Sequence, residues 1–275
     1  TPPFEATLKD GWLIGRGVQD DKGPSLAALY AVKSLLDQGL VFTKRIRFIF
    51  GTDEETLWRC MNRYNQLEEK ADLGFAPDSS FPLTYAEKGL LQVKLHGPGW
   101  EDRPLQAGRA LNVVPDKATY KGERLEELLP VIEQSGVNYT EEAGAVTVLG
   151  LSKHSKDAAE GVNAIVGLAE SLSLIQPHPA LLFIADAVGQ DATGAALFGE
   201  IKDEPSGALS FNIATLSIDE ERSEIGIDIR IPVLADKDAL VERLTEVAAS
   251  YQLQYEEFDY VAPLYVPLDS PLVST

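Results

Sequence analysis

The first 78 residues alternate between short apolar runs and helical patterns. Apolar runs cover Trp12–Ile14, residues 46–50 and residues 73–77, and each is bounded by glycine, proline or polar residues. Such runs predict buried strands. Between them, apolar side chains recur at helical spacing over residues 23–39, and a second helix is expected over residues 54–70. A strand–helix–strand–helix–strand order predicts a parallel sheet, typical of the α/β class.

The pattern changes near residue 88, after which separated strands and helices follow one another without the regular strand–helix alternation. This order of separated strands and helices is typical of an α+β domain. We therefore predict three segments, with residues 1–87 in a first domain, 88–265 in a second and 266–275 returning to the first. The proline-rich stretch from residue 256 onward is expected to be the return linker. The second domain's predicted strands cover residues 89–96, 145–149, 213–218 and 225–232, and its predicted helices cover residues 125–134, 161–174 and 237–251.

Composition narrows the classes of function. The 275 residues carry 43 acidic and 24 basic side chains, a net charge of −19, which repels nucleic acid and anionic membrane surfaces. Neither is an expected partner. The single cysteine, Cys60, cannot form an internal disulfide. We therefore expect a cytoplasmic enzyme. We also expect it to be a monomer. Because the sequence starts at a threonine and stops just after a turn-rich stretch, we expect it to be a fragment.

Acidic residues cluster at the ends of the predicted strands. Asp20 follows the first strand, Glu54 and Glu55 follow the second, and Asp78 follows the third. Loops after parallel strands share one edge of the sheet, where such folds bind ligands. Several carboxylates brought together require a cation, and oxygen ligands alone would favour Mg²⁺ or Mn²⁺. The alternative is that each carboxylate caps a helix N-terminus, which is the more common role for any one of them.

The strings that hold these residues are specific. Residues 15–23 read GRGVQDDKG, residues 51–55 read GTDEE and residues 75–78 read FAPD. Together they resemble the di-zinc exopeptidase family, which includes carnosinases, carboxypeptidase G, succinyl-diaminopimelate desuccinylase and the bacterial dipeptidase V (Xaa-His dipeptidase) enzymes. The resemblance is strongest to the dipeptidase V branch. It extends over nearly the whole chain, through residues 112–116, 150–164 and 228–232.

This resemblance implies a partial parallel-sheet catalytic domain of the α/β class with an inserted α+β, ferredoxin-like lid domain. It implies two Zn²⁺ ions, with Mn²⁺ or Co²⁺ as substitutes. Asp20 would bridge both ions, Glu55 would bind one and Asp78 the other. A water shared by the ions would attack the peptide bond, and Glu54 would act as the general base.

Two of the five metal ligands of the family are missing. The family pattern needs a His-x-Asp motif upstream and a histidine downstream, whereas the only histidines here are His96, His154 and His178. The resemblance implies that the missing ligands lie outside residues 1–275. The chain alone is then expected to bind metal weakly and to be inactive.

Three residues of the second domain match substrate-binding positions of the family. His154 resembles the lid histidine that stabilises a tetrahedral oxyanion, although the proline that usually follows is absent. Arg230 has the planar fork suited to the terminal carboxylate of a dipeptide. Asn112 would donate its amide to the substrate carbonyl. The alternatives are an exposed loop or cap for His154, a strand-edge ion pair for Arg230 and a turn for Asn112. For His96 and His178 we expect structural roles.

The leading functional hypothesis is a hydrolase (a metalloprotease) that removes the N-terminal residue from dipeptides. A second hypothesis is an amidohydrolase of the same family that acts on N-acyl amino acids. A third is a non-catalytic binding module that keeps the fold. The chain keeps three expected metal ligands, Asp20, Glu55 and Asp78, together with the expected base Glu54. Their presence argues against a non-catalytic module.

Overall fold

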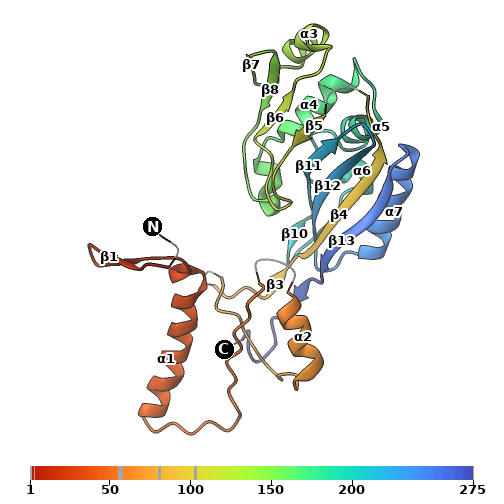
Figure 1. The fold of residues 1–275 in the computed structure, drawn as a ribbon. Helices are drawn as coiled ribbons and strands as arrows, with labels where there is room; N and C mark the ends of the chain where they lie inside the picture. The colour runs from red at the N-terminus through yellow and green to blue at the C-terminus, as the bar shows by residue number, and fades with distance from the viewer. Residues whose placement is uncertain (1, 3, 55–57, 80–81, 102–103, 275) are drawn as a thin grey trace. The chain divides into compact units, whose positions relative to one another are not determined.

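The computed structural model describes residues 2, 4–54, 58–79, 82–101 and 104–274. The chain divides into two units (Figure 1). Unit 1 comprises residues 1–84 and 268–275, and unit 2 comprises residues 85–267.

Unit 1 begins with a hairpin in which β1 (Thr7–Lys9) pairs antiparallel with β2 (Trp12–Ile14). Its two-residue turn is Asp10-Gly11, and both residues have positive φ, 52° and 82°. Asp-Gly is favoured there because the turn requires left-handed backbone at both positions. The helix predicted over residues 23–39 is confirmed as α1 (Gly23–Asp37). It follows a short helical segment, η1 (Val18–Lys22).

The second helix of unit 1 is shorter than predicted. The helix expected over residues 54–70 is α2 (Arg59–Leu67). The carboxylate of Asp53 accepts hydrogen bonds from the backbone nitrogen of Arg59 at 3.0 Å and from its Nε at 2.8 Å. These bonds satisfy a free N–H group at the helix start, so the helix begins at Arg59.

Two predicted strands of unit 1 are wrong. Residues 46–50 and 73–77 form no strand, and every ladder of the described residues is antiparallel. A parallel strand buried on both faces needs a paired neighbour and a covering layer. Here Ile46 is 44% exposed and Phe50 is 70% exposed, so neither is covered within the described residues. The apolar pattern predicted burial but could not supply the partner strand.

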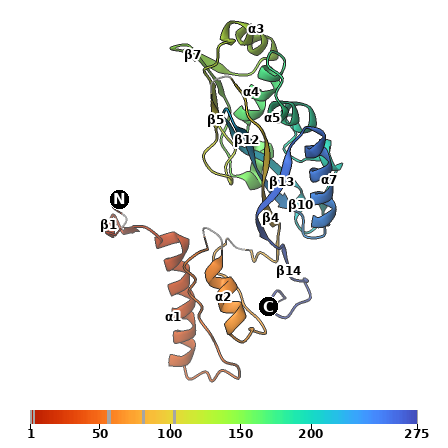
Figure 2. The same ribbon diagram turned by 45° about the vertical axis from the view of Figure 1, so that its right-hand side comes forward.

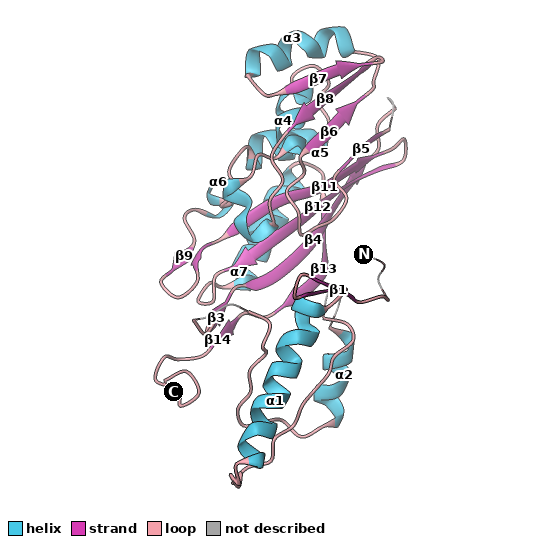
Figure 3. Ribbon diagram, turned by 90° about the vertical axis from the view of Figure 1, so that its left-hand side faces the viewer, coloured by secondary structure: helices cyan, strands magenta, loops and turns pink. Residues whose placement is uncertain are grey.

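Unit 2 is built on a five-stranded antiparallel sheet with strand order β13-β4-β12-β11-β5 (Figure 3). Without β5, the chain order β4, α4, β11, β12, α7, β13 and this strand order give a ferredoxin-like arrangement. The mixed α and β class predicted from the sequence is confirmed. The elements are β4 (Gly89–Pro98), β5 (Leu105–Ala107), α4 (Ala164–Ser173), β11 (Ser210–Ile218), β12 (Arg222–Ile231), α7 (Lys237–Ser250) and β13 (Gln254–Val261).

The return linker predicted from residue 256 is wrong in its first part, because residues 254–261 form β13 along the edge of β4 (Figure 2). The prolines at positions 263 and 267 come after this strand, where missing N–H groups cost no ladder bonds. The acidic residues of β13 interrupt the alternation of apolar and polar positions that would predict a strand. Glu256 pairs in register with Lys94, and an edge strand can carry such charges toward water.

A second, three-stranded sheet is inserted between β4 and α4, with strand order β6-β8-β7. The predicted strand at 145–149 and the predicted helix at 125–134 are confirmed as β8 (Ala145–Leu149) and α3 (Leu125–Ser135). The remaining elements are β3 (Ala86–Glu87), β6 (Lys117–Tyr120), β7 (Tyr139–Glu142), η2 (Ser155–Glu160), α5 (Pro179–Leu182), η3 (Phe183–Val188), α6 (Ala195–Phe198), β9 (Lys202–Asp203), β10 (Gly207–Ala208) and β14 (Leu264–Tyr265).

Strand alternation divides the main sheet of unit 2 into two faces. Leu91, Val93 and Leu95 of β4 are fully buried in the core that also includes residues of α4 and α7. The intervening residues of β4 and their neighbours on β12, including Asp228 and Arg230, lie on the opposite face because successive side chains of a strand point to opposite sides. This opposite face, called the polar face below, carries the candidate site. No helix among the described residues is both long and apolar enough to cross a membrane.

Candidate functional site

In unit 1 the structure brings together part of the predicted acidic cluster. Asp20 and Asp21 lie in η1, joined by a cis peptide bond, and Ser25 Oγ donates a hydrogen bond to Asp21 Oδ1 at 2.5 Å. Partial desolvation raises the pKa of Asp78 above its ordinary value, and the negative charges of Asp20 and Asp21 raise it further. Asp20 and Asp78 are therefore close enough to interact electrostatically.

The other two predicted acidic residues are less well placed. Glu54 is exposed in the turn before α2, and Glu55 lies outside the described residues. Among the residues that the structure describes, no three histidine, cysteine, aspartate or glutamate side chains converge closely enough to hold a metal ion. The described carboxylates therefore do not form a complete metal centre by themselves. The roles of Asp20, Glu54, Glu55 and Asp78 remain predictions.

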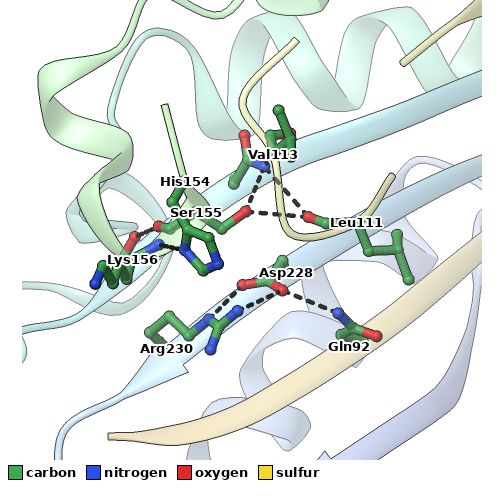
Figure 4. A network of polar contacts seen from close by, with 10 residues as sticks. Gln92, Leu111, Val113, His154, Ser155, Lys156, Asp228 and Arg230 are labelled. Carbon is green, nitrogen blue, oxygen red and sulfur yellow. Dashed lines mark hydrogen bonds and ion pairs between the residues drawn. The ribbon is translucent and has the colours of Figure 1, made fainter. Parts of the chain in front are cut away.

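In unit 2, Arg230 lies on the polar face of β12 and pairs with Asp228 (Figure 4). Its Nε donates to Asp228 Oδ1 at 2.8 Å and its Nη2 to Asp228 Oδ2 at 3.3 Å. Gln92 Nε2, from the adjacent strand β4, donates to Asp228 Oδ2 at 3.0 Å. The side chain of Asp228 is 0% exposed, whereas that of Arg230 is 19% exposed. The guanidinium therefore reaches the surface above a buried carboxylate.

His154 lies beside this pair (Figure 4), at the start of η2. Its Nδ1 accepts a hydrogen bond from the backbone nitrogen of Lys156 at 3.2 Å. Partial burial lowers the pKa of the imidazole, and the positive charge of Arg230 lowers it further. The neutral ring is thus favoured, and since Nδ1 is an acceptor, Nε2 carries the proton. His154 is placed to donate from Nε2 at neutral pH.

Loops that contain the predicted residues are held over the polar face by buried polar contacts. Ser155 Oγ donates to the carbonyl oxygen of Leu111 at 3.0 Å. Asn212 Nδ2, from β11, donates to Ser155 Oγ at 2.8 Å and to the carbonyl oxygen of Val113 at 3.0 Å. The backbone of Asn112 accepts from Ser155 N at 2.9 Å, and Asn112 itself is exposed. The site therefore joins β11, β12 and two loops.

Sequence reasoning missed three residues of this arrangement: Asp228, Gln92 and Lys88. Burial lowers the pKa of the Lys88 ammonium, and among the nearby charges Arg230 lowers it as well. Lys88 Nζ also donates to the carbonyl oxygen of Ala208. Alternation along β4 and β12 could have revealed Gln92 and Asp228 as polar residues on one face. Arg230 and Lys88 give this face a local positive charge, and the neutral His154 adds a hydrogen-bond donor, which suits a bound carboxylate.

The other two histidines have structural contacts. His178 is 4% exposed, its Nδ1 accepts from Ala180 N at 3.2 Å and its Nε2 contacts the carbonyl oxygens of Pro98 and Gly99 at 3.2 and 3.3 Å. His96 Nε2 lies 2.7 Å from Glu256 Oε2. Both contacts agree with the structural roles predicted from the sequence.

Comparison with known proteins agrees with the sequence strings. The model of peptidase family M20/M25/M40 matches residues 1–272. A Bacillus subtilis (strain 168) protein named "Putative dipeptidase YtjP" is 35% identical over 99% of this chain and 63% of its own length. A Staphylococcus aureus (strain USA300) protein with the same description is 32% identical over 98% of this chain and 63% of its own length. The crystal structure of human carnosine dipeptidase 1 aligns with a TM-score of 0.43 and 14% identity, over 99% of this chain and 60% of that one.

The chain thus spans about 63% of the length of the curated relatives that it matches. The match to the family model covers almost all of the chain, in both unit 1 and unit 2. The resemblance carried by the acidic strings is confirmed at the level of the family. The chain belongs to peptidase family M20/M25/M40.

Proposed function

We propose that the full-length protein is a metal-dependent dipeptidase. The observation that carries this proposal is the polar face of unit 2, where Arg230, held by Asp228, lies beside a neutral His154. A cationic fork next to a hydrogen-bond donor suits a short peptide with a free carboxylate. Curated relatives described as dipeptidases support the same class of substrate.

We propose that unit 1 supplies the metal centre. Asp20, Glu55 and Asp78 would hold two Zn²⁺ ions, which when bound activate water for attack on a peptide carbonyl. Support comes from the acidic strings and from the pKa of Asp78, which partial desolvation raises and the nearby charges of Asp20 and Asp21 raise further. Glu54 would accept a proton from the attacking water and pass it to the leaving amine.

We propose that unit 2 acts as the lid and holds the substrate. Asp228 engages the Nε edge of Arg230, so the opposite edge, formed by Nη1 and Nη2, would bind the terminal carboxylate. His154 would donate from Nε2 to the developing oxyanion, and Asn112 would contact the substrate carbonyl. A cytosolic setting is part of the proposal, since the single Cys60 gives no sign of a disulfide framework. A monomeric state is proposed with it.

An amidohydrolase that acts on N-acyl amino acids is the main competing function. Its substrates also end in a carboxylate, so Arg230 does not distinguish the two classes. The distinction lies in the free ammonium group that a dipeptide has and an N-acyl amino acid lacks. A non-catalytic module is the other alternative.

Substrate panels separate these functions. Full-length protein, loaded with Zn²⁺, would be assayed on unmodified dipeptides and on N-acetyl amino acids with matched side chains. We expect dipeptide hydrolysis that a chelator abolishes and added metal restores. Hydrolysis confined to N-acetyl amino acids would establish the amidohydrolase, and the absence of any metal-dependent hydrolysis would leave the binding module.

A further inference from the structure

We infer that Asp228 is a positioning residue, which with Gln92 fixes the guanidinium of Arg230 so that its Nη1–Nη2 edge meets the substrate carboxylate. This inference rests on the proposed function, since it concerns how that site holds its substrate. It adds two residues to the site. Both act through Arg230 and not by contact with the substrate.

The geometry of the ion pair supports this role. Asp228 and Arg230 are two residues apart on β12, so their side chains lie on the same face of the sheet. Asp228 accepts from Nε at 2.8 Å and from Nη2 at 3.3 Å, which uses the side edge of the fork. A guanidinium has five N–H groups, and the edge away from Asp228 keeps two parallel donors. Those donors match the two oxygens of a carboxylate.

The carboxylate of Asp228 is itself held from another strand. Gln92 lies opposite Asp228 in the β4–β12 ladder, and its Nε2 donates to Asp228 Oδ2 at 3.0 Å. On the other side, Asp228 is in register with Asn212 of β11, whose amide anchors the loops over the site. Asp228 therefore occupies a central strand between two neutral amides. The base of Arg230 is fixed by elements of the sheet, while its outer edge lies nearer the surface.

Burial argues against a merely incidental ion pair. Burying a carboxylate is costly, and replacing a buried pair with apolar residues is often neutral or stabilising, so such a pair is weak support for a purely stabilising role. Asp228 is 0% exposed and Arg230 only 19% exposed. An arginine held in one rotamer before binding loses less conformational freedom when the ligand arrives. A buried aspartate under a partly exposed arginine therefore suits preorganisation for an anion.

The test is a double-mutant cycle in full-length, metal-loaded protein. Asp228→Asn keeps the shape of the side chain but removes the charge that holds Nε and Nη2. We expect kcat/KM for dipeptides with a free carboxylate to fall about 10- to 100-fold, mainly through KM, as for a buried charged pair that loses one partner. For the matching dipeptide amides the fall should be about twofold or less. Asp228→Asn should add little to the loss caused by Arg230→Ala, because coupled residues are not additive.

Glu224→Gln is the matched control. Glu224 is on the same strand and face, and it pairs with Lys94 at 3.1 Å, away from Arg230. Glu224→Gln should leave kcat/KM unchanged for both the free dipeptides and their amides. If Asp228→Asn fails to fold, judged by its thermal unfolding, Gln92→Leu serves instead, since it removes one hydrogen bond from Asp228 and should give a smaller loss with the same preference for acid substrates.

The outcomes are distinct. Equal losses on acids and amides, or losses that multiply with those of Arg230→Ala, would overturn the positioning role and leave the dipeptidase intact. An Arg230→Ala enzyme that discriminates acid from amide as the wild type does would also overturn it. A wild type that hydrolyses no dipeptide would instead refute the proposed function, on which this inference depends.

Discussion

At the scale of single residues, the proposed role of Arg230 is to bind the carboxylate of the substrate. Its Nε pairs with Asp228 at 2.8 Å, and its side chain is 19% exposed. We expect Arg230→Ala to lower kcat/KM for free dipeptides by about 2–4 kcal/mol, the scale of a charged hydrogen-bonded pair that loses one partner. Arg230→Lys should also lose activity, because lysine keeps the charge but not the fork. Steady-state kinetics on acid and amide substrates measure this, and equal losses on both would mean that Arg230 only supports the strand.

Glu54 gives a second prediction at the same scale. If it is the general base and not a ligand, Glu54→Ala should reduce turnover by about 10²–10⁴-fold while the bound metal stays constant. Asp78→Ala should instead reduce the metal content, measured by elemental analysis of the full-length protein. Metal loss from Glu54→Ala in proportion to activity would reassign Glu54 as a ligand.

His178 predicts a pH dependence of stability. Burial lowers its pKa in the folded state below the ordinary value of about 6.5, despite opposing hydrogen bonds from its ring to the carbonyls of Pro98 and Gly99. Below pH 6.5 the unfolded chain binds the proton more readily, so the stabilising effect of neutral His178, complete above that pH, is lost as the pH falls through the folded pKa.

We therefore expect His178→Gln to destabilise the chain by about 1–3 kcal/mol at pH 7.5, because the hydrogen bond to Ala180 N and the ring contacts are lost. The difference in the free energy of unfolding between this variant and the wild type should be smaller at pH 5. Urea unfolding at the two pH values measures it, with His96→Gln as the control, since the side chain of His96 is 33% exposed. A gap of the same size at both pH values would show that His178 does not titrate in this way.

At the scale of elements, Asn163 links a helix to the sheet. Its side-chain oxygen caps α4 by accepting from Ile165 N at 3.0 Å, and its Nδ2 donates to the carbonyl oxygen of Ile213 at 2.7 Å. We expect Asn163→Ala to cost about 2–3 kcal/mol, because both the cap and a bond to the sheet disappear.

Asp236 is the matched control for this prediction. It caps α7 by accepting from Asp238 N at 2.9 Å and Ala239 N at 3.2 Å, and both contacts are exposed. Asp236→Ala removes a cap alone and should cost about 1 kcal/mol. Denaturant unfolding of unit 2 measures both, and equal losses would mean that the bonds from Asn163 to the sheet add nothing.

At the scale of the whole molecule, the two units differ in how much apolar surface they bury. Unit 2 has a continuous core around its sheet, whereas α1 of unit 1 has no buried residue, and Leu36 on it is 53% exposed. We predict that residues 85–267 expressed alone unfold cooperatively, with a free energy of about 5–15 kcal/mol. Residues 1–84 alone should show no cooperative transition. Calorimetry of the two pieces tests this prediction. Unfolding of residues 85–267 without a cooperative transition would contradict it.

The local pattern of the sequence was enough to predict most of unit 2. The strands around Val93, Val148 and Ile227 and the helices α3, α4 and α7 follow from alternation and from helical spacing, because each buries an apolar face against a neighbour within the unit. The edge strand β13 was missed because charged residues toward water break the pattern. The roles proposed for Arg230 and His154 came only from the resemblance of their strings to a known family.

What the sequence determined by itself is therefore the residue types, the periodicity of unit 2 and membership of the peptidase family, since these depend on order along the chain. Only the tertiary structure decided which side chains meet. Asp228 and Gln92 are 136 positions apart and become neighbours through strand pairing, and the approach of Asp78 to Asp20 likewise depends on the fold. In unit 1 the apolar runs predicted strands, but a strand needs a pairing partner, and pairing is a property of the folded chain and not of a local pattern.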